Sequence, residues 1–396
     1  MTDMTAITNE AARDAGHLDL SRRFAGFDRL EEPRVVIDEA VLDANIAAMA
    51  KLAADAGVEL RPHAKTHKSI GIATLQKLHG ATGFTVARPY EAKMLLDKGL
   101  GPVTIAYPLI APQTIATLLA ATDNAADLRF IADSAETVAA LAEGARIAAR
   151  KANVMIKVDV GLHRCGVDPA GDLGVTLAAA IDADPQLVFA GLLSHAGHAY
   201  GAGTPEMIRA IAGTELQIMA SLRTRIERHG IEVHSVSIGS TPSVICHAGF
   251  DGVTEIRPGN YAFYDLTAVR LGLVSRNHLA LGIAARIVAV NDHYAVANVG
   301  SKTLTSDLGA HGTSATTSFG EAWLPQADAP LAVVKLSEEH AFLTYGENRP
   351  VVGTPVLILP NHSCPVANLS GGMLLLEKDG KGRRELAVEG FVGNFR

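Results

Sequence analysis

The chain has 396 residues, which is too long for one small core and favours two or three domains, or one barrel with an accessory domain. Apolar residues make up 48% and charged residues 19%, as in an ordinary globular protein, and this balance excludes a disordered chain. The formal net charge of −7 lacks the basic excess with which proteins bind nucleic acids or anionic membranes.

The sequence also predicts a location. No uninterrupted apolar run reaches the roughly 18 residues of a membrane span, so we expect none. Residues 1–30 carry charges throughout and lack the apolar core of a secretion signal. The cysteines, Cys165, Cys246 and Cys364, form a sparse, odd set that argues against a disulfide framework. Together these features predict a cytoplasmic protein.

The chain opens with residues 1–30, which we expect to be irregular or helical. The β-branched run at residues 35–37 then predicts a short strand. Asp38 follows this strand and can cap the next helix. That helix carries apolar residues on one face, at Val41, Leu42, Ile46 and Met49.

Short apolar runs then alternate with alanine- and leucine-rich segments that are long enough for a helix. This alternation predicts βαβ units and a parallel sheet. Eight runs occur, the number that closes a TIM-type (β/α)8 barrel. An open doubly wound sheet fits the same alternation, and the preference for a barrel comes partly from the resemblance given below. The runs lie at residues 58–63, 82–87, 102–106, 127–132, 153–159, 187–194, 233–238 and 253–257.

The pattern changes after about residue 275, where helical stretches nearly vanish. Short runs separated by turn residues predict a mainly antiparallel β domain. These runs lie at residues 281–290, 294–299, 331–336, 356–359 and 373–377, with a long loop expected at 305–320. The predicted class is therefore α/β, with the barrel at residues 41–275 and the β domain at 276–396. Residues 1–40 form an N-terminal segment whose strand we expect to join the β domain.

A basic segment, residues 61–68 (RPHAKTHK), stands at the end of the first predicted barrel strand. Catalytic groups of barrels lie at the C-terminal ends of strands. Burial of Lys65 there would disfavour its ammonium form and free the amine to make an imine. Taken alone, the segment is equally compatible with solvated cations at a helix start, although cations there oppose the helix dipole.

This segment resembles the Schiff-base segment of the D-serine dehydratase and D-threonine aldolase family. These are fold-type III pyridoxal 5′-phosphate enzymes related in architecture to alanine racemase, and the similarity runs from about residue 33 to the C-terminus. The resemblance implies that Lys65 carries the cofactor as a Schiff base. It assigns no role to Lys68.

Two loops are candidates for holding the cofactor phosphate. A phosphate needs backbone N–H donors from small residues or a helix start. Residues 238–243 and 257–261 follow the seventh and eighth predicted strands, where barrels often bind phosphate, and the resemblance points to the same loops. Each turn alone would be unremarkable as a simple turn. The candidate residues are Gly239, Ser240, Thr241, Gly259, Asn260 and Tyr261.

Other cofactor contacts are implied by the resemblance. Arg164 matches the arginine that hydrogen-bonds the phenolic oxygen, although His163 stands beside it where a less polar residue is expected. His195 would pack against the pyridine ring, and Tyr200 matches a tyrosine near the ring nitrogen. A neutral partner there makes the ring a weaker electron sink than a carboxylate would. Each histidine can equally be structural, and Glu91, which recurs in similar enzymes, can be a local cap.

His362 and Cys364 form the strongest chemical pattern in the β domain. In an extended chain, residues i and i+2 point the same way, so the pair can grip one ion. Imidazole with thiolate favours zinc over magnesium or manganese. A lone His-x-Cys more often means a buried cysteine beside a turn histidine. The resemblance supports the metal, since water-eliminating members carry His-x-Cys and carbon–carbon-cleaving members more often carry His-x-Asp.

The resemblance therefore implies a lyase of D-β-hydroxy amino acids. Lys65 would take the Cα proton, zinc would activate the β-hydroxyl as a leaving group, and D-serine would give pyruvate and ammonia. Three alternatives remain: aldolase cleavage to glycine and an aldehyde, an amino-acid racemase, and a non-catalytic pyridoxal phosphate-binding protein. D-Serine, D-threonine and 3-hydroxy-D-aspartate are all candidate substrates.

The family resemblance also implies a homodimer. Further residues that can line the site are Lys302, Asp307, Glu338, Glu339 and His340. Solvated loop charges are the plainer interpretation of all five.

Overall fold

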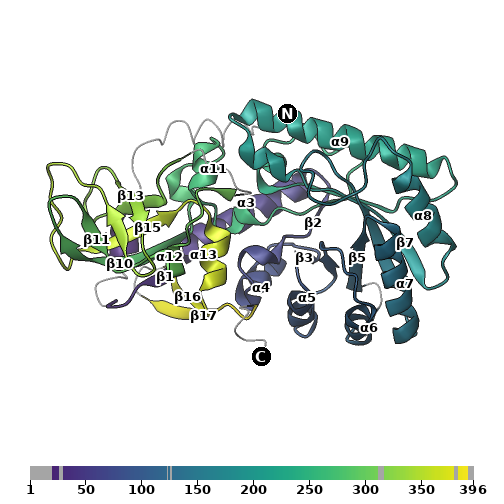
Figure 1. Cartoon of the computed structure of the whole chain (residues 1–396), viewed down its shortest axis with the longest axis horizontal. Coiled ribbons are helices and arrows are strands. Elements are labelled where there is room, and N and C mark those ends of the chain that lie inside the picture. Colours follow the sequence, from purple (N-terminus) through teal and green to yellow (C-terminus); the bar gives the residue numbers. More distant parts are fainter. Residues whose placement is uncertain are drawn as a thin grey trace. The chain divides into compact units, whose positions relative to one another are not determined.

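The computed structural model describes residues 20–25, 30–122, 124, 127–310, 316–378 and 382–390. The chain divides into two compact units, each built from more than one segment (Figure 1). The barrel unit comprises residues 49–65 and 72–259, and the β unit comprises residues 1–48, 66–71 and 260–396. Of the expected N-terminal segment, residues 1–19 and 26–29 lie outside the described residues, as do 311–315 of the expected loop.

The barrel unit contains an eight-stranded, entirely parallel sheet in the order β2-β9-β8-β7-β6-β5-β4-β3. A bridge between His63 and Thr85 joins the two ends and nearly closes the sheet. The predicted TIM-type barrel is thereby confirmed, and a strand lies in each of the eight apolar runs. The strands are β2 (Glu59–Leu60), β3 (Phe84–Val86), β4 (Val103–Ile105), β5 (Leu128–Ala132), β6 (Ala152–Lys157), β7 (Leu187–Leu193), β8 (Ser235–Ile238) and β9 (Glu255–Ile256).

Three barrel helices, α7, α9 and α10, begin at a Ser or Thr that caps them, and Figure 1 places α5 to α9 around the outside of the sheet. The Thr204 hydroxyl accepts a hydrogen bond from the Met207 N–H at 3.3 Å and caps α9 (Pro205–Glu227). Buried residues then recur along α9 at helical spacing: Ile208, Ala212, Glu215, Met219, Leu222 and Ile226. The other helices that follow barrel strands are α4 (Ile70–Leu78), α5 (Pro89–Leu96), α6 (Pro112–Ala120), α7 (Ala135–Ala148), α8 (Leu173–Ala183) and α10 (Thr241–Ile245).

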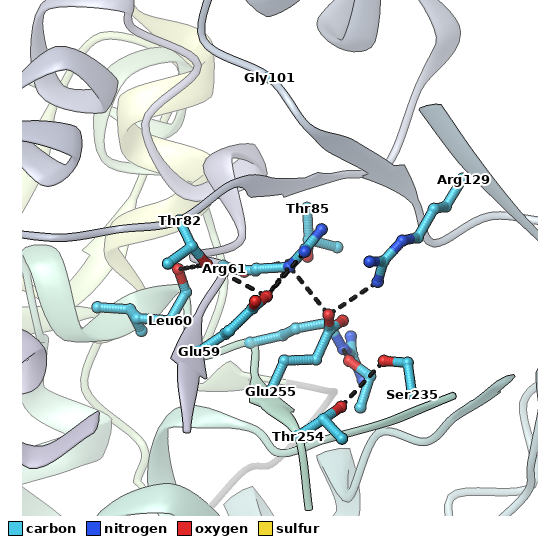
Figure 2. A network of polar contacts seen from close by, with 12 residues as sticks. Glu59, Leu60, Arg61, Thr82, Thr85, Gly101, Arg129, Ser235, Thr254 and Glu255 are labelled. Atoms are coloured by element: carbon cyan, nitrogen blue, oxygen red, sulfur yellow. Dashed lines mark hydrogen bonds and ion pairs between the residues drawn. The ribbon is translucent and has the colours of Figure 1, made fainter. Parts of the chain in front are cut away.

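An ionic network lies near the N-terminal ends of the barrel strands (Figure 2). Glu255, 1% exposed at the start of β9, forms an ion pair with Arg61, whose Nε lies 2.9 Å from its Oε2, and accepts a hydrogen bond from Arg129 Nη1 at 2.8 Å. Arg61 also donates to the half-exposed Glu59 at 2.7 Å. Catalytic groups of barrels occupy the opposite end, so this network has a structural role.

The β unit contains a nine-stranded sheet in the order β11-β14-β13-β12-β15-β10-β1-β16-β17. Strand β1 pairs antiparallel with β10 and parallel with β16, so the N-terminal strand lies inside this sheet. All other pairings are antiparallel. The strands are β1 (Arg34–Asp38), β10 (Leu281–Val290), β11 (Ala295–Ala297), β12 (Gly320–Trp323), β13 (Leu331–Leu336), β14 (Ala341–Leu343), β15 (Pro355–Pro360), β16 (Gly372–Leu376) and β17 (Arg383–Ala387).

Helices of the β unit are short, except for α3 (Glu39–Asp55), which begins in this unit and ends in the barrel unit. As predicted, Asp38 caps α3, because its Oδ1 accepts from the N–H groups of Ala40 and Val41 at 3.1 and 3.2 Å. The remaining helices are α2 (Leu20–Ala25), α11 (Leu266–Arg270), α12 (Ser301–Leu304) and α13 (Ser363–Leu369). Among the described residues, none of the helices is both long and apolar enough to span a membrane.

Candidate functional site

Lys65 follows the first barrel strand, in the short 3-10 helix Ala64–Thr66. Lys65 is half-buried, and its backbone N–H donates to Nδ1 of the buried His63 at 3.4 Å. The backbone N–H groups of Arg61 and His63 donate to the carbonyls of Ile256 and Pro258, at the end of β9 and just after it. These hydrogen bonds fix the backbone that leads to Lys65. Lys65 therefore stands where barrels carry catalytic groups.

The loop after β8 is shaped by a glycine. Gly239 has φ of 101°, and an added Cβ would lie 2.5 Å from Cγ2 of Val244, so a side chain does not fit. Ser240 caps α10, with Ser243 as its reciprocal partner. This is a tight turn leading into a helix start, as a phosphate requires. The Gly239 N–H, however, points to Glu215 Oε1 at 3.4 Å.

Glu215 is a buried carboxylate that the sequence analysis missed. It is 1% exposed, and its Oε1 also accepts from the Ser194 hydroxyl at 2.6 Å. Its Oε2 is buried and has no hydrogen-bond partner among the residues that the structure describes. Glu215 thus ties the ends of β7 and β8 to α9. The signal that would have revealed it is a charged residue at an otherwise apolar position of a helix.

His195 and Tyr200 follow β7. The half-buried His195 lies with Nδ1 3.5 Å from the Gly239 carbonyl, which joins it to the loop after β8. Tyr200 is 9% exposed, within the 3-10 helix Gly197–Gly201. Both therefore stand at the C-terminal end of the barrel, as expected for groups that face a cofactor.

Arg164 lies in the loop after β6 with an exposed side chain. The neighbouring His163 has φ of 54°, and its Nδ1 lies 2.9 Å from Asp159 Oδ2. Burial alone would raise the pKa of Asp159, but hydrogen bonds from the N–H groups of Gly161 and His163 lower it. His163 is 82% exposed, and its contact with Asp159 closes the loop that carries Arg164.

Lys157 and Arg257 place two basic groups inside the barrel that the sequence analysis did not single out. Lys157 ends β6 and is 5% exposed; burial lowers its pKa to about 7, and Arg257 adds to the effect. Burial likewise lowers the pKa of Arg257 to about 10. Arg257 donates to the Ser237 hydroxyl at 2.5 Å and to the Ser194 carbonyl. The strand ends are therefore linked by a buried polar network.

In the β unit, Asn260 and Tyr261 begin the 3-10 helix Asn260–Ala262. Tyr261 is fully buried, so its side chain is a core residue of this unit. Asn260 donates to Asp265 Oδ2 at 2.8 Å and to Ser363 Oγ at 3.1 Å, and its Nδ2 lies 4.0 Å from Cys364 Sγ. The side chain of Asn260 thus belongs to the surroundings of the cysteine.

His362 and Cys364 do not lie on an extended chain, which corrects the geometry expected from the sequence. His362 has extended backbone angles but is the N-cap of α13, and Cys364 lies in the first turn of that helix. The side chains nevertheless meet, because the turn from β15 into α13 brings them together. His362 Nδ1 lies 2.9 Å from Asp307 Oδ2, and Cys364 Sγ lies 3.5 Å from Thr66 Oγ1.

The two side chains favour each other's charged form. Burial alone would lower the pKa of His362, but its hydrogen bond to Cys364 and the thiolate charge raise the pKa to about 9. Burial alone would raise the pKa of Cys364, but the hydrogen bond and charge of His362 lower it. A low thiol pKa supplies the thiolate that binds metals.

The donor set fits a zinc ion with open positions. The pair supplies one imidazole nitrogen and one thiolate, both donors that zinc prefers. No group of three or more His, Cys, Asp or Glu residues suited to a metal occurs among the described residues. Water or substrate would complete the shell of such an ion.

The remaining candidates are local surface groups. Lys302 pairs with Glu339 at 2.9 Å and with Glu338 at 3.7 Å, and all three side chains are exposed. His340 Nδ1 lies 3.4 Å from Ser337 Oγ in the same turn. Glu91 caps α5, because its Oε2 accepts from the N–H groups of Ala87 and Arg88. Of the five loop residues that can line the site, Asp307 is the one whose side chain lies against His362.

Comparison with known proteins gives matches along nearly the whole chain. Residues 37–266 match the family model of the alanine racemase N-terminal domain, and residues 280–376 match that of the D-serine dehydratase domain. The D-threo-3-hydroxyaspartate dehydratase of Delftia sp. (strain HT23) is 30% identical over 85% of this chain and 91% of its own. The D-serine dehydratase of Dictyostelium discoideum is 28% identical over 89% and 95%, and the D-threonine aldolase of Arthrobacter sp is 28% identical over 89% and 90%.

Solved structures of the same kinds of protein are also similar to this chain. The Delftia dehydratase has a TM-score of 0.84 at 28% identity, covering 91% of this chain and 98% of that one. A D-threonine aldolase from Filomicrobium marinum has a TM-score of 0.82 at 26% identity, covering 92% and 97%. An alanine racemase from Clostridium difficile, at 14% identity and a TM-score of 0.64, shares the fold.

Proposed function

Because this chain belongs to the family of pyridoxal phosphate-dependent D-β-hydroxy amino acid dehydratases and aldolases, we propose that it dehydrates such an amino acid to a 2-oxo acid and ammonia. D-Serine, D-threonine and 3-hydroxy-D-aspartate are the proposed substrate class. The observation that carries the choice is the donor pair itself: the side chain that His362 meets two positions further along the chain is that of Cys364, not a carboxylate. Two relatives named as dehydratases support it.

Residues that follow the barrel strands, including the turn at residues 259–261 after β9, are proposed to hold the cofactor. Lys65 would carry it, Arg164 would face its phenolic oxygen, His195 its ring and Tyr200 its ring nitrogen. Its phosphate would lie against the two glycine turns, at Gly239, Ser240, Thr241, Gly259, Asn260 and Tyr261. Bound there, pyridoxal phosphate supplies an electron sink for the Cα carbanion. The freed Lys65 amine would remove the Cα proton, and Tyr200 would keep the ring nitrogen free of a carboxylate partner.

His362 and Cys364 are proposed to bind a divalent metal, with zinc favoured by the donor types. Zinc supplies Lewis acidity that makes a hydroxyl a better leaving group. The thiolate would lie against the Thr66 hydroxyl and near the Asn260 amide, and these two donors would share its charge. We further propose a cytoplasmic homodimer, as the sequence resemblance implies.

A second candidate function is aldolase cleavage to glycine and an aldehyde. It keeps the same residues and is favoured by the D-threonine aldolase of Arthrobacter sp among the relatives, at 28% identity. In that reaction the β-hydroxyl loses a proton instead of leaving. The two reactions give different products, so one experiment separates them.

The test is product analysis with purified protein, pyridoxal phosphate and zinc. D-Serine, D-threonine and 3-hydroxy-D-aspartate are offered separately, and the Lys65→Ala variant is the control. We expect a 2-oxo acid and ammonia from at least one substrate, no product from the variant, and loss of the internal Schiff-base absorbance in it. Glycine with an aldehyde would establish the aldolase instead. Schiff-base absorbance that persists in the variant would overturn the assignment of Lys65.

A further inference from the structure

Asp307, one of the five loop residues that the sequence offers for lining the site, approaches the proposed metal pair from a loop distant in the chain. Its Oδ2 lies 2.9 Å from His362 Nδ1, across a separation of 55 residues. A histidine that binds a metal through one ring nitrogen has a hydrogen on the other. With Nδ1–H donated to Asp307, the lone pair of the neutral ring is on Nε2.

The loop holds Asp307 in place beside His362. The Asp307 N–H donates to the Thr305 hydroxyl at 3.2 Å, and the Asp307 carbonyl accepts from Asn361 Nδ2 at 3.4 Å. Asn361 directly precedes His362 and is 1% exposed. The same amide donates to the Ser318 carbonyl at 2.6 Å, and its oxygen accepts from Arg270 Nη1 at 3.0 Å. One buried amide thus fixes the backbone of Asp307 beside the residue that precedes the histidine.

The backbone leading to Asp307 is strained, which separates it from an ordinary surface loop. Thr305 has φ of 67°, in the left-handed region that a β-branched residue rarely adopts. Its side chain is 9% exposed and receives the Asp307 N–H. Strain of this kind persists only where the surroundings hold it, so the position of Asp307 is determined by the fold.

We propose that Asp307 is the positioning residue of the metal site: it accepts the Nδ1 hydrogen of His362 and thereby presents Nε2 to the ion. The inference rests on the proposed function and assigns a role to a residue that does not itself touch the metal. A carboxylate behind a metal-binding histidine fixes the ring orientation and increases the basicity of the ligand nitrogen. The plainer interpretation is a surface ion pair, which would not affect metal affinity.

The test measures zinc affinity of the full chain with bound pyridoxal phosphate, by competition with a chromophoric chelator. Loss of such a carboxylate typically weakens binding by about 10- to 100-fold, and we expect that loss in Asp307→Ala. Asp307→Asn, whose amide oxygen can accept the same hydrogen, should recover part of the affinity. Glu338→Gln is the matched control, an exposed carboxylate of the same unit, and should stay within about twofold of the wild type.

Cobalt(II) in place of zinc gives a spectroscopic readout of the same site. We expect the thiolate-to-cobalt absorption band in Asp307→Asn to differ in position or intensity from the wild type, since the imidazole is less basic. If Asp307→Ala does not fold, by far-ultraviolet circular dichroism, Asp307→Asn alone decides the outcome.

The outcomes separate this inference from the proposed function. If His362→Ala and Cys364→Ala lose zinc while both Asp307 variants bind it as the wild type does, Asp307 has no positioning role and the metal site stands. If the wild-type protein binds zinc no better than His362→Ala does, the proposed metal site fails and this inference fails with it. Weakened binding in both Asp307 variants, with Glu338→Gln unchanged, supports the positioning role.

Discussion

At the scale of single residues, Lys157 is the group whose charge depends most directly on the fold. It is buried at the end of β6, near the also buried Arg257, and burial lowers its pKa from 10.5 to about 7. An unfolded chain would therefore bind a proton on Lys157 between these two pH values, and the folded chain would not. The free energy of unfolding must then rise with pH across this range, because the unfolded state binds more protons.

The Lys157→Met variant tests this dependence, since methionine is of similar length and carries no charge. As pH rises from about 7 to about 9, the wild type should gain about 1–2 kcal/mol of unfolding free energy relative to the variant. Urea unfolding of both cofactor-free proteins at the two pH values measures the difference. Parallel pH dependence of wild type and variant would show that Lys157 keeps its proton in the folded barrel.

The site residues divide by how they could be recognised in the sequence. Lys65 and the His362–Cys364 pair stand in short continuous segments, so their residue types, together with the family resemblance, were enough to single them out. Glu215 lies among apolar positions of α9, where its carboxylate gave no pattern of its own. Asp307 resembled any loop charge, because its partner His362 is 55 residues away and only the fold joins them.

At the scale of elements, the ends of the barrel differ in chemistry. The C-terminal end carries Lys65, His195 and the glycine turns, whereas the N-terminal end carries the ionic network of Figure 2. In that network Glu255 is 1% exposed and forms ion pairs with both Arg61 and Arg129. Removing one partner of a buried ion pair leaves an uncompensated charge and is strongly destabilising.

We therefore expect Glu255→Gln to lower the free energy of unfolding by about 3–5 kcal/mol. Glu59→Gln is the matched control: it removes a carboxylate from the same arginine, but Glu59 is 48% exposed, and a loss under about 1 kcal/mol is expected. Denaturant unfolding of both variants gives the comparison. Equal losses would mean that the buried carboxylate is no more important than the exposed one.

The strands were predictable where their composition was apolar and hidden where it was not. All eight barrel runs and the long β10 were found by hydrophobic pattern, since parallel strands are buried on both faces. Every residue of β17 except Leu386 is exposed, so this strand offers almost no apolar signal. β12 and β14 span only 4 and 3 residues, and α13 follows β15 so closely that the segment resembled a continuous strand.

At the scale of the whole molecule, the β unit depends on a strand from the other end of the chain. β1 lies between β10 and β16, with Val35 and Val36 each at most 3% exposed. A fragment of residues 260–396 would lack this strand and leave both of its neighbours with unpaired edges. Exposed apolar strand edges promote aggregation.

We expect the 260–396 fragment to be insoluble or unfolded when expressed alone. A fusion that adds residues 30–48 through a flexible linker should be soluble and show β-sheet circular dichroism. Soluble yield and the circular dichroism spectrum distinguish the fragment from the fusion. A folded, soluble 260–396 fragment would show that the sheet tolerates the loss of its inner strand.

The order of the barrel and the β domain along the chain was predictable, because helical stretches nearly vanish from the sequence after about residue 275. Which residues belong to the β unit was less predictable, because the unit includes residues 66–71, a short segment directly after Lys65. Six residues carry no compositional mark that would separate them from the barrel sequence around them. Such an assignment comes from long-range packing, which periodicity does not record.

The inner position of β1 also means that this strand is synthesised long before the strands with which it pairs. Val35 and Val36 pair with Ile283 and Gly282, which a ribosome adds long after the N-terminal strand has emerged. At about 5–20 residues per second, the strand waits on the order of 10–50 s for its first partner. The barrel segment is complete in the meantime, so an apolar strand must remain unpaired beside a growing chain. Cells that make this protein therefore have reason to shield its first fifty or so residues until translation is nearly finished.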